Sequence, residues 1–460
     1  MKKFDETESF ESFSLNQDLF KAIQEMGYSK PTPVQNAVIP SALEGKDITA
    51  KAPTGSGKTA AFGLPSLNLI SQSPKHQMLI LAPTRELALQ VCGEMEKFSK
   101  YLKITPNAIY GGEPMGKQLK QLRKDNRIIV GTPGRLLDLF RSKYLTDFNP
   151  SIVVLDEGDE MLNMGFFEDI QAIFSFLPKK RQTLLFSATL SPKIQKISKK
   201  FLKDPLLIDL STNEKEHKDI HQIYYLIPNR KRKQALVQTL QFHLPKKAIV
   251  FCNTKKEVEE LSSDLTALGF PIVSIQGDMS QKERQNSINK FRTASDKILV
   301  ATDVAARGID VSDISYVFNY DLPYSSDSFT HRVGRTGRMG NKGTAITLVS
   351  LNQKYLIKKI LLKKVSEIDF TSLPTKDELK SVLEKRFADQ LKKEPLHKDA
   401  EKLLIALKKG QSLDEIAKCL ISKHLQKQSY FEFDECLIDS SADKRQRAPR
   451  NRKRAFFRKR

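Results

Sequence analysis

A glycine-rich stretch near the amino terminus carries the residue types that bind a nucleoside triphosphate. It reads Ala52-Pro53-Thr54-Gly55-Ser56-Gly57-Lys58-Thr59 and joins a strand-like run, 47–52, to a helical run that begins at Lys58. A strand that turns through glycines into a helix presents backbone N–H groups and the positive end of the helix dipole to phosphate groups. In such a loop the lysine contacts the outer phosphates and the threonine hydroxyl binds Mg²⁺. We therefore predict that residues 54–59 bind a nucleotide, although the generic motif has glycine in place of Ala52.

An acidic pair follows an apolar run farther along the chain. Ile152-Val153-Val154-Leu155 is followed directly by Asp156 and Glu157. Such a run is typical of a buried parallel strand, whose carboxyl end delivers side chains to the ligand-binding edge of the sheet. The sequence therefore predicts that Asp156 binds the same Mg²⁺ as Thr59. The alternative is that the pair caps a helix and binds no ligand.

Composition limits the class of protein. A chain of 460 residues is too long for one hydrophobic core and predicts two to four domains. With 39% hydrophobic residues, 28% charged residues and a polar amino terminus, we expect a soluble protein without a membrane span or secretory signal. The four cysteines and seven histidines lack disulfide-like or metal-like spacing, which is typical of a reducing, cytoplasmic compartment. The net charge of +22 favours a polyanionic partner.

Strand-like and helix-like runs alternate in two series, which predicts two α/β domains with parallel sheets. Only the first series contains a Gly-Lys-Thr loop, so we expect one nucleotide between two domains that open and close. The predicted strands of the first series are 47–52, 77–83, 106–110, 127–132, 151–157 and 182–189. Those of the second are 220–228, 247–254, 272–278, 296–303, 314–320 and 343–350.

The chain resembles the DEAD-box RNA helicases of superfamily 2 from about Phe10 to Lys364. The motifs occur in order, and a dozen of them in sequence would not arise by chance. In the first series they are Phe10 with Gln35, the phosphate loop, Pro83-Thr84-Arg85-Glu86-Leu87, Gly111-Gly112, Thr132-Pro133-Gly134-Arg135, Asp156-Glu157-Gly158-Asp159 and Ser187-Ala188-Thr189. In the second they are Ile249 to Asn253, Gln276 to Met279 with Gln281 and Arg284, Ala301-Thr302-Asp303 to Gly308-Ile309-Asp310, and His331 to Arg338.

The resemblance implies a fold of two RecA-like domains and predicts a domain map. We expect a disordered amino terminus over 1–9, a first RecA-like domain over 10–210 and a second over 220–365, joined by the linker 211–219. A helical module, 372–428, and a disordered basic tail, 440–460, would follow.

Phosphoryl transfer requires a phosphate cradle, Mg²⁺, a carboxylate that orients water, and cations that stabilise the transition state. The phosphate cradle and the Mg²⁺ site would be supplied by Lys58, Thr59 and Asp156. We assign to Glu157 the role of the carboxylate that orients the attacking water. The resemblance implies that Arg335 and Arg338 are arginine fingers from the second domain, so hydrolysis would need domain closure. It also implies that Gly308 and Asp310 bind the nucleotide, with Asp310 on the ribose, and that Phe10 and Gln35 select adenine.

The resemblance implies that four further residues couple the nucleotide to the rest of the protein: Asp159, Ser187, Thr189 and His331. In the family, the residue at Asp159 links to the Ser187-Ala188-Thr189 segment and to His331. The chain departs from the family at Gly158, where the name-giving motif has alanine. We expect catalysis to survive this change, because the carboxylates on either side are retained, and we expect any effect to fall on coupling.

RNA contacts are predicted for loops at the sheet edges, which combine small residues with hydroxyls and cations suited to phosphates. These residues are Thr84, Arg85, Gly112, Thr132, Gly134, Arg135 and Thr302. Phosphate contacts carry no sequence information, so we expect sequence-independent binding of single-stranded and duplex RNA, with sensitivity to the 2′-OH. The resemblance implies local unwinding driven by ATP. Two other functions remain open at this point: a non-catalytic RNA-binding or annealing protein, and a DNA-directed superfamily 2 translocase.

The family motifs end before the last part of the chain. Thr375 with Glu378 and Ser412 with Glu415 form capping boxes, which predict helices within 372–428. These helices would either pack back on the second domain or form a homodimer. The segment from Lys444 to Arg460 contains ten Lys and Arg residues and no acid, so we expect an RNA tether; the alternatives are a solvated tail without a partner or a localisation signal.

Overall fold

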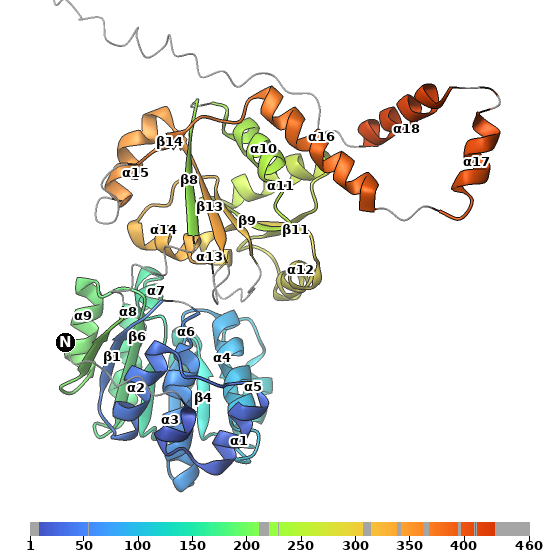
Figure 1. The fold of residues 1–460 in the computed structure, drawn as a ribbon. Helices are drawn as coiled ribbons and strands as arrows, with labels where there is room; N and C mark the ends of the chain where they lie inside the picture. Colours follow the sequence, from blue (N-terminus) through green and yellow to red (C-terminus); the bar gives the residue numbers. More distant parts are fainter. Residues whose placement is uncertain are drawn as a thin grey trace, which may run out of the picture.

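The computed structural model describes residues 9–53, 55–210, 220–228, 230–306, 314–337, 342–361, 368–393, 397–408, 410 and 412–427. These residues form two seven-stranded parallel sheets, each with helices on both faces, followed by three further helices (Figure 1). The predicted fold class is confirmed. Within the described residues, no helix is long and apolar enough to cross a membrane. The predicted linker, 211–219, and the basic tail lie outside the described residues, as does the predicted amino-terminal segment apart from Ser9.

Domain 1 contains the sheet β3-β4-β2-β5-β6-β1-β7. Its strands are β1 (Ile48–Lys51), β2 (Met78–Leu81), β3 (Asn107–Ile109), β4 (Ile128–Gly131), β5 (Ile152–Leu155), β6 (Gln182–Ser187) and β7 (Leu206–Asp209). Its helices are η1 (Phe10–Phe13), α1 (Gln17–Glu25), α2 (Pro33–Leu43), α3 (Lys58–Gln72), α4 (Arg85–Phe98), α5 (Met115–Leu122), α6 (Pro133–Arg141), α7 (Gly158–Asn163), α8 (Phe167–Phe176) and α9 (Pro192–Phe201). The edge strand β7 was not among the predicted strands.

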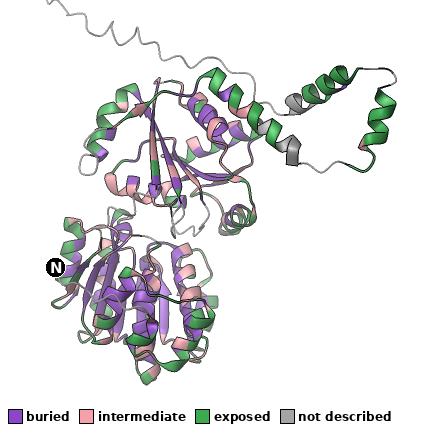
Figure 2. Ribbon diagram, viewed as in Figure 1, coloured by how far each residue is buried: buried purple, intermediate pink, exposed green. Residues whose placement is uncertain are grey.

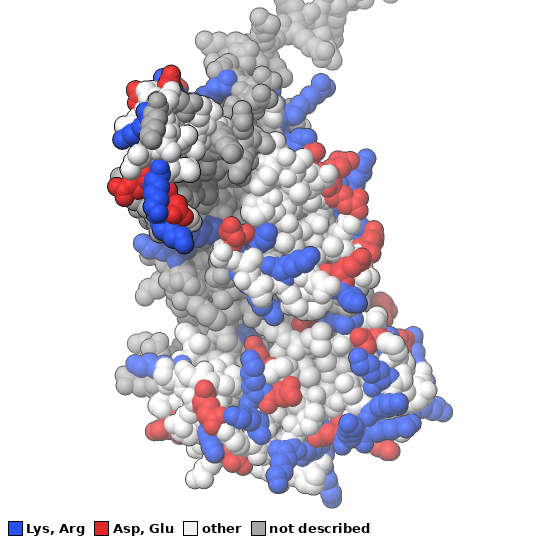
Figure 3. Space-filling view, turned by 90° about the vertical axis from the view of Figure 1, so that its right-hand side faces the viewer, with Lys and Arg blue, Asp and Glu red and all other residues white. Residues whose placement is uncertain are grey.

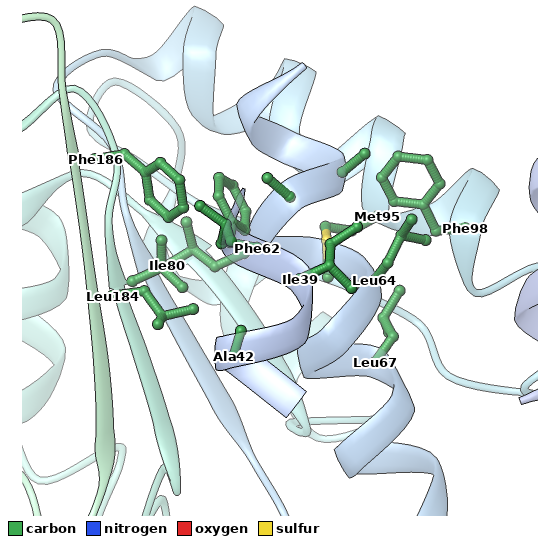
Figure 4. Packing of buried hydrophobic residues seen from close by; sticks show 14 of the residues in the cluster. Ile39, Ala42, Phe62, Leu64, Leu67, Ile80, Met95, Phe98, Leu184 and Phe186 are labelled. Carbon is green, nitrogen blue, oxygen red and sulfur yellow. The ribbon is translucent and has the colours of Figure 1, made fainter. Parts of the chain in front are cut away.

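The central strands of domain 1 are buried on both faces, as their continuous apolar sequences indicate (Figure 2). On one face, helices α1 to α4 pack against alternate strand residues, and Phe62 of α3 meets Phe186 of β6 with ring centroids 5.3 Å apart (Figure 4). Helices α6, α8 and α9 contribute to the core on the other face. This packing fixes α3, and with it the loop that enters α3, against the centre of the sheet.

Domain 2 contains the sheet β10-β11-β9-β12-β13-β8-β14. Its strands are β8 (Ile220–Ile227), β9 (Lys247–Cys252), β10 (Ile272–Ile275), β11 (Lys297–Thr302), β12 (Tyr316–Asn319), β13 (Gly343–Ser350) and β14 (Phe370–Thr371). Its helices are α10 (Arg232–His243), α11 (Lys255–Ala267), α12 (Gln281–Thr293), α13 (Asp303–Ala306), α14 (Ser326–Val333), η2 (Leu351–Gln353) and α15 (Lys354–Leu361).

Three helices follow domain 2, where the sequence predicted a helical module. They are α16 (Lys376–Lys393), α17 (Ala400–Leu407) and α18 (Leu413–Lys427). Helix α16 packs against α10 of domain 2. In contrast, α17 contains no buried residue, and in Figure 2 both α17 and α18 are mainly exposed.

Candidate nucleotide and RNA sites

The phosphate loop lies between β1 and α3, as predicted. Gly55 and Gly57 have φ angles of +81° and +92°, which favour glycine. A Cβ atom on Gly57 would lie 2.5 Å from the Gln35 side chain, so the loop also has no room for a larger residue there. The Lys58 ammonium is buried and donates a hydrogen bond of 3.3 Å to the Ala52 carbonyl, which holds it over the loop. These features fit a triphosphate.

Gln35 contacts this loop directly, whereas Phe10 does not offer its ring to a ligand. The Gln35 amide donates to the Gly57 carbonyl at 3.2 Å and accepts from the Thr32 backbone N–H at 2.8 Å. The ring of Phe10 is 1% exposed and packs edge-on against Phe13 and Tyr28. The resemblance implied that Phe10 helps to select adenine, but core packing covers its ring in this structure and leaves no face on which adenine could stack. Thr54 lies outside the described residues.

Asp156 and Glu157 follow β5 at the carboxyl edge of the sheet. Asp156 is buried and accepts a hydrogen bond of 3.0 Å from the Glu157 backbone N–H. Burial raises the pKa of Asp156 to about 7; the Lys58 ammonium opposes this shift and Glu157 adds to it. A buried carboxylate beside another carboxylate is well suited to a hard divalent cation, so the pair fits Mg²⁺ together with Thr59. Glu157 has φ +49°, a conformation that is uncommon for residues other than glycine and concentrates at functional sites.

Gly158, the departure from the family motif, lies at the start of α7 against the core. A Cβ atom here would lie 2.8 Å from Leu185 Cδ1 and 3.3 Å from Ile194 Cδ1. Both neighbours are fully buried, so their side chains occupy the space that an alanine methyl would need.

We expect Gly158→Ala to destabilise domain 1 slightly. Overpacking a core costs about 1–3 kcal/mol, which exceeds the roughly 0.5–1 kcal/mol that alanine gains over glycine in a helix. Urea unfolding of the variant should therefore show a lower midpoint than that of the parent protein. Adding Leu185→Val should recover part of the loss, because it removes the methyl group in contact. Strictly additive effects of the two changes would contradict this account.

Asp159 links α7 to the segment after β6, as the resemblance implied. Its carboxylate accepts a hydrogen bond of 3.0 Å from the Thr189 backbone N–H, and the Ser187 hydroxyl donates to the Thr189 carbonyl at 2.7 Å. His331 of domain 2 reaches the same helix, with its Nε2 3.8 Å from the Asp159 carboxylate.

Glu160, which was not among the predicted site residues, is the direct partner of His331. The two side chains form a short hydrogen bond across the domain interface, and both are largely buried. Burial lowers the pKa of His331, but the hydrogen bond and the negative charge of Glu160 outweigh this effect and the net shift is upward. The contact between His331 and Glu160, which protonation of His331 favours, therefore joins domain 2 to α7, the helix that begins directly after Glu157.

Two arginines in the His331 to Arg338 motif have different environments. Arg332 is 1% exposed, and its guanidinium is held by Asp303, Asn253 Oδ1 and the Asp321 carbonyl. Arg335 is partly exposed and lines a small cavity between the domains with Glu160 and His331. Its side chain makes no hydrogen bond or ion pair with the described residues, so its charge is available to a ligand. Gly308, Asp310 and Arg338 lie outside the described residues.

The predicted RNA residues of domain 1 gather at the carboxyl edge of its sheet. Thr84 caps α4 by accepting from the Leu87 N–H at 3.2 Å, and Thr132 precedes α6. Gly112 has φ +83°. The Arg85 guanidinium lies 4.3 Å from the ring centre of Tyr110 and 3.6 Å from the Glu113 carboxylate, while Arg135 donates to the Glu113 carbonyl at 2.9 Å.

Open space surrounds Gly134, since a Cβ atom there would meet nothing within 4 Å. In domain 2, Thr302 ends β11 and its hydroxyl accepts from the Ala305 N–H at 3.4 Å. A second contact joins the two domains near these residues: Arg284 Nε of α12 lies 2.7 Å from the Glu86 carboxylate of α4. This ion pair joins the two domains beside the loops that the sequence predicts to bind RNA.

Comparison with known proteins identifies the family. The DEAD/DEAH box helicase family model matches residues 32–197, and the helicase conserved C-terminal domain matches residues 231–340. The chain is 42% identical over 372 residues to the DEAD-box ATP-dependent RNA helicase RhpA of Helicobacter pylori, covering 80% of this chain and 75% of the relative. It is also 42% identical over 375 residues to CshA of Bacillus subtilis, covering 81% and 76% respectively.

Solved structures agree with the sequence relatives. The structure of S. cerevisiae Dbp5 bound to RNA and ADP BeF3 is similar with a TM-score of 0.73 and 34% identity, and the match covers 82% of this chain and 100% of that one. The two sheets, and the order of the motifs along the chain, are thus those of known RNA helicases. The chain belongs to the DEAD-box ATP-dependent RNA helicases.

Proposed function

We propose that this RNA-stimulated ATPase hydrolyses ATP at the domain 1 edge and uses domain closure to separate short RNA duplexes. The observation that carries the proposal is the contact of Glu160 with His331, because it joins domain 2 to the helix that follows the acidic pair. Lys58 and the glycines of its loop would hold the phosphates, and Glu157 would orient the attacking water. Bound Mg²⁺, held by Thr59 and Asp156, would neutralise charge on the β- and γ-phosphates.

Domain 2 would complete the site only on closure. Arg335, and Arg338 from outside the described residues, would stabilise the charge that develops on the transferred phosphoryl group. Gly308 and Asp310 are proposed to contact the nucleotide as well. The RNA backbone would be held by residues of the loops at the sheet edges, namely Thr84, Arg85, Gly112, Thr132, Gly134, Arg135 and Thr302. Because closure brings together residues from both domains, RNA and ATP should promote each other's binding.

Comparing RNA with DNA as a stimulant tests this proposal. We expect RNA and Mg²⁺ together to raise the rate of ATP hydrolysis, and DNA of the same sequence to have little effect, because the 2′-OH distinguishes the two polymers. Equal stimulation by DNA would favour the DNA-directed translocase, and no stimulation at all would favour the non-catalytic RNA-binding protein.

The contact between His331 and Glu160 predicts a pH dependence of domain closure. Because the pKa of His331 is raised above about 6.5, protonation stabilises the contact, which is complete below that pH and is lost as pH rises through the raised pKa. The groups that face His331 are Asp159 and Glu160, which favour protonation, and Arg335, which opposes it. Glu160→Gln should therefore move the alkaline fall of kcat/KM to lower pH.

The pH profile of RNA-stimulated hydrolysis provides the measurement. Glu168→Gln is a matched control, because Glu168 is an exposed residue of the neighbouring helix α8. The control should retain the profile of the parent enzyme. Superimposable profiles for all three proteins would show that His331 does not titrate in the working enzyme.

We also propose that the carboxyl-terminal helices form a homodimer. Leu403, Ile405 and Leu420 are 65%, 58% and 63% exposed, an unusual density of apolar surface on two short helices. This supports dimerisation over simple packing on domain 2, and sedimentation of the full chain over a range of concentrations would test it. The role of the segment 444–460 as an RNA tether stays a prediction.

A further inference from the structure

A groove of about 1060 Å³ runs along the outer edge of domain 1, apart from the nucleotide site. Its floor includes Ala108 of the edge strand β3, and its walls are α4 on one side and α5 with the segment after α6 on the other. Helices α4 and α5 both run from the RNA-facing edge of the sheet to the opposite end. A groove between them therefore connects these two ends of domain 1.

One end of the groove reaches the proposed RNA contacts. Tyr110 follows β3 and lines the groove, and its ring lies under the Arg85 guanidinium at 4.3 Å. Arg85 is in turn 3.6 Å from Glu113, whose carbonyl accepts from Arg135. Arg85 and Arg135 belong to the RNA contacts proposed above, which we call the core site. A strand of RNA bound there would leave the core site beside the entrance of the groove.

The other end of the groove is lined by cations that have no acidic partner. Lys103, Arg123 and Lys124 are exposed and make no ion pair with any described residue. Three acids also line the groove, Glu96, Asp125 and Asp147, and none of them forms an ion pair with these cations. Asp125 is bound instead by Arg127 at 2.9 Å and by the Thr105 N–H at 3.1 Å. Figure 3 faces this side of domain 1 and shows more blue than red side chains over its lower part.

The groove also offers an aromatic ring to a base. Tyr144 lines it after the end of α6 and is 54% exposed. Cations that follow a backbone, combined with rings on which bases stack, are the usual elements of sequence-independent single-strand binding. An extended peptide pairing with β3 is the other candidate. It is disfavoured because β3 has only three residues and follows Pro106, both of which discourage strand addition.

We propose that this groove binds the single-stranded RNA that continues beyond the core site. Phosphates would lie on Lys103, Arg123 and Lys124, and a base would stack on Tyr144. The proposal rests on the RNA contacts proposed above and adds the groove to them as a second RNA-binding surface. It would let the enzyme hold a long single strand beside the duplex that it separates, and so distinguish long RNAs from short ones.

The test compares the full chain with a groove variant, Lys103→Gln with Arg123→Gln, Lys124→Gln and Tyr144→Ala. A matched control carries Lys179→Gln, Lys180→Gln and Lys193→Gln, which are exposed residues outside the groove. Affinity is measured for oligouridylates lengthened stepwise at the 5′ or the 3′ end, with a non-hydrolysable ATP analogue present. We expect the parent and the control to gain affinity as one end grows past the core length, and the groove variant to stop gaining.

Salt dependence provides a second measure. Losing about three phosphate contacts should reduce the slope of log K against log[salt] for the long RNA by about 2, since each contact on a single strand contributes about 0.7. Short RNA should stimulate ATP hydrolysis equally in all three proteins. An unchanged length dependence and slope in the groove variant would overturn the proposal and leave a peptide as the better candidate. If the groove variant lost as much affinity for short RNA as for long RNA, the proposal would also be overturned, because the changes would then have damaged the core site. Absence of RNA stimulation in the parent protein would instead count against the proposed function.

Discussion

Glu157→Gln is expected to lower kcat for RNA-stimulated ATP hydrolysis by about 10²–10⁴-fold while ATP and RNA still bind. An amide has nearly the shape of a carboxylate but cannot accept a proton from the attacking water. The substitution leaves the surroundings of the site intact, because the contact of residue 157 with Asp156 is made by its backbone N–H. The buried Lys58 and the glycine turns of the phosphate loop do not depend on this side chain.

Separate measurements of binding and turnover are needed. Equilibrium binding of a fluorescent ATP analogue and of RNA should match the parent protein, whereas steady-state hydrolysis should fall. Glu168→Gln, the same change on the exposed face of α8, should alter neither quantity. A variant that keeps a near-normal kcat would remove Glu157 from its assigned role, and one that loses ATP affinity would make it a ligand-binding residue instead.

Features encoded by local patterns could be predicted from the sequence. The phosphate loop depends on neighbouring residues, with glycines for the turn and a lysine at the start of the helix, and the structure has it where predicted. The central strands, such as Ile152–Leu155, are continuous apolar runs, so their burial follows from composition. The edge strand Leu206–Asp209 was missed because its mixed burial gives no such run: Leu207 is 59% exposed.

Features that depend on distant contacts could not be predicted. Glu160 is one more acid at the start of a helix, and nothing local indicates that His331 lies opposite it in the other domain. The burial of Phe10 follows from its packing with Tyr28, which the sequence alone does not reveal. The sequence identified Gly158 as a departure from the family. The reason it fits, the packing of Leu185 and Ile194, required the structure.

Arg335→Ala is expected to reduce kcat by about 10³–10⁵-fold, the range that an arginine finger contributes to phosphoryl transfer. The two arginines of this segment differ in their partners. Arg332 donates to the Asp303 carboxylate, Asn253 Oδ1 and the Asp321 backbone carbonyl, so its loss would leave these three acceptors without their donor and destabilise domain 2. Arg335 has no such commitment within the described residues and faces the interdomain cavity beside Glu160 and His331. A cation without an internal partner costs little stability when it is removed, so its loss should affect turnover alone.

The measurement combines single-turnover hydrolysis at saturating RNA and ATP with thermal unfolding. We expect Arg335→Ala to unfold at the temperature of the parent protein and to bind ATP with similar affinity, and Arg335→Lys to recover only part of the rate, because an ammonium lacks the bidentate fork. Arg292→Ala, at an exposed position in the last turn of α12, should have no effect on either quantity. If ATP affinity falls while the single-turnover rate is unchanged, Arg335 binds the ground state rather than the transition state. If the unfolding temperature falls as well, Arg335 stabilises the fold of domain 2, and the assignment of the finger passes to Arg338.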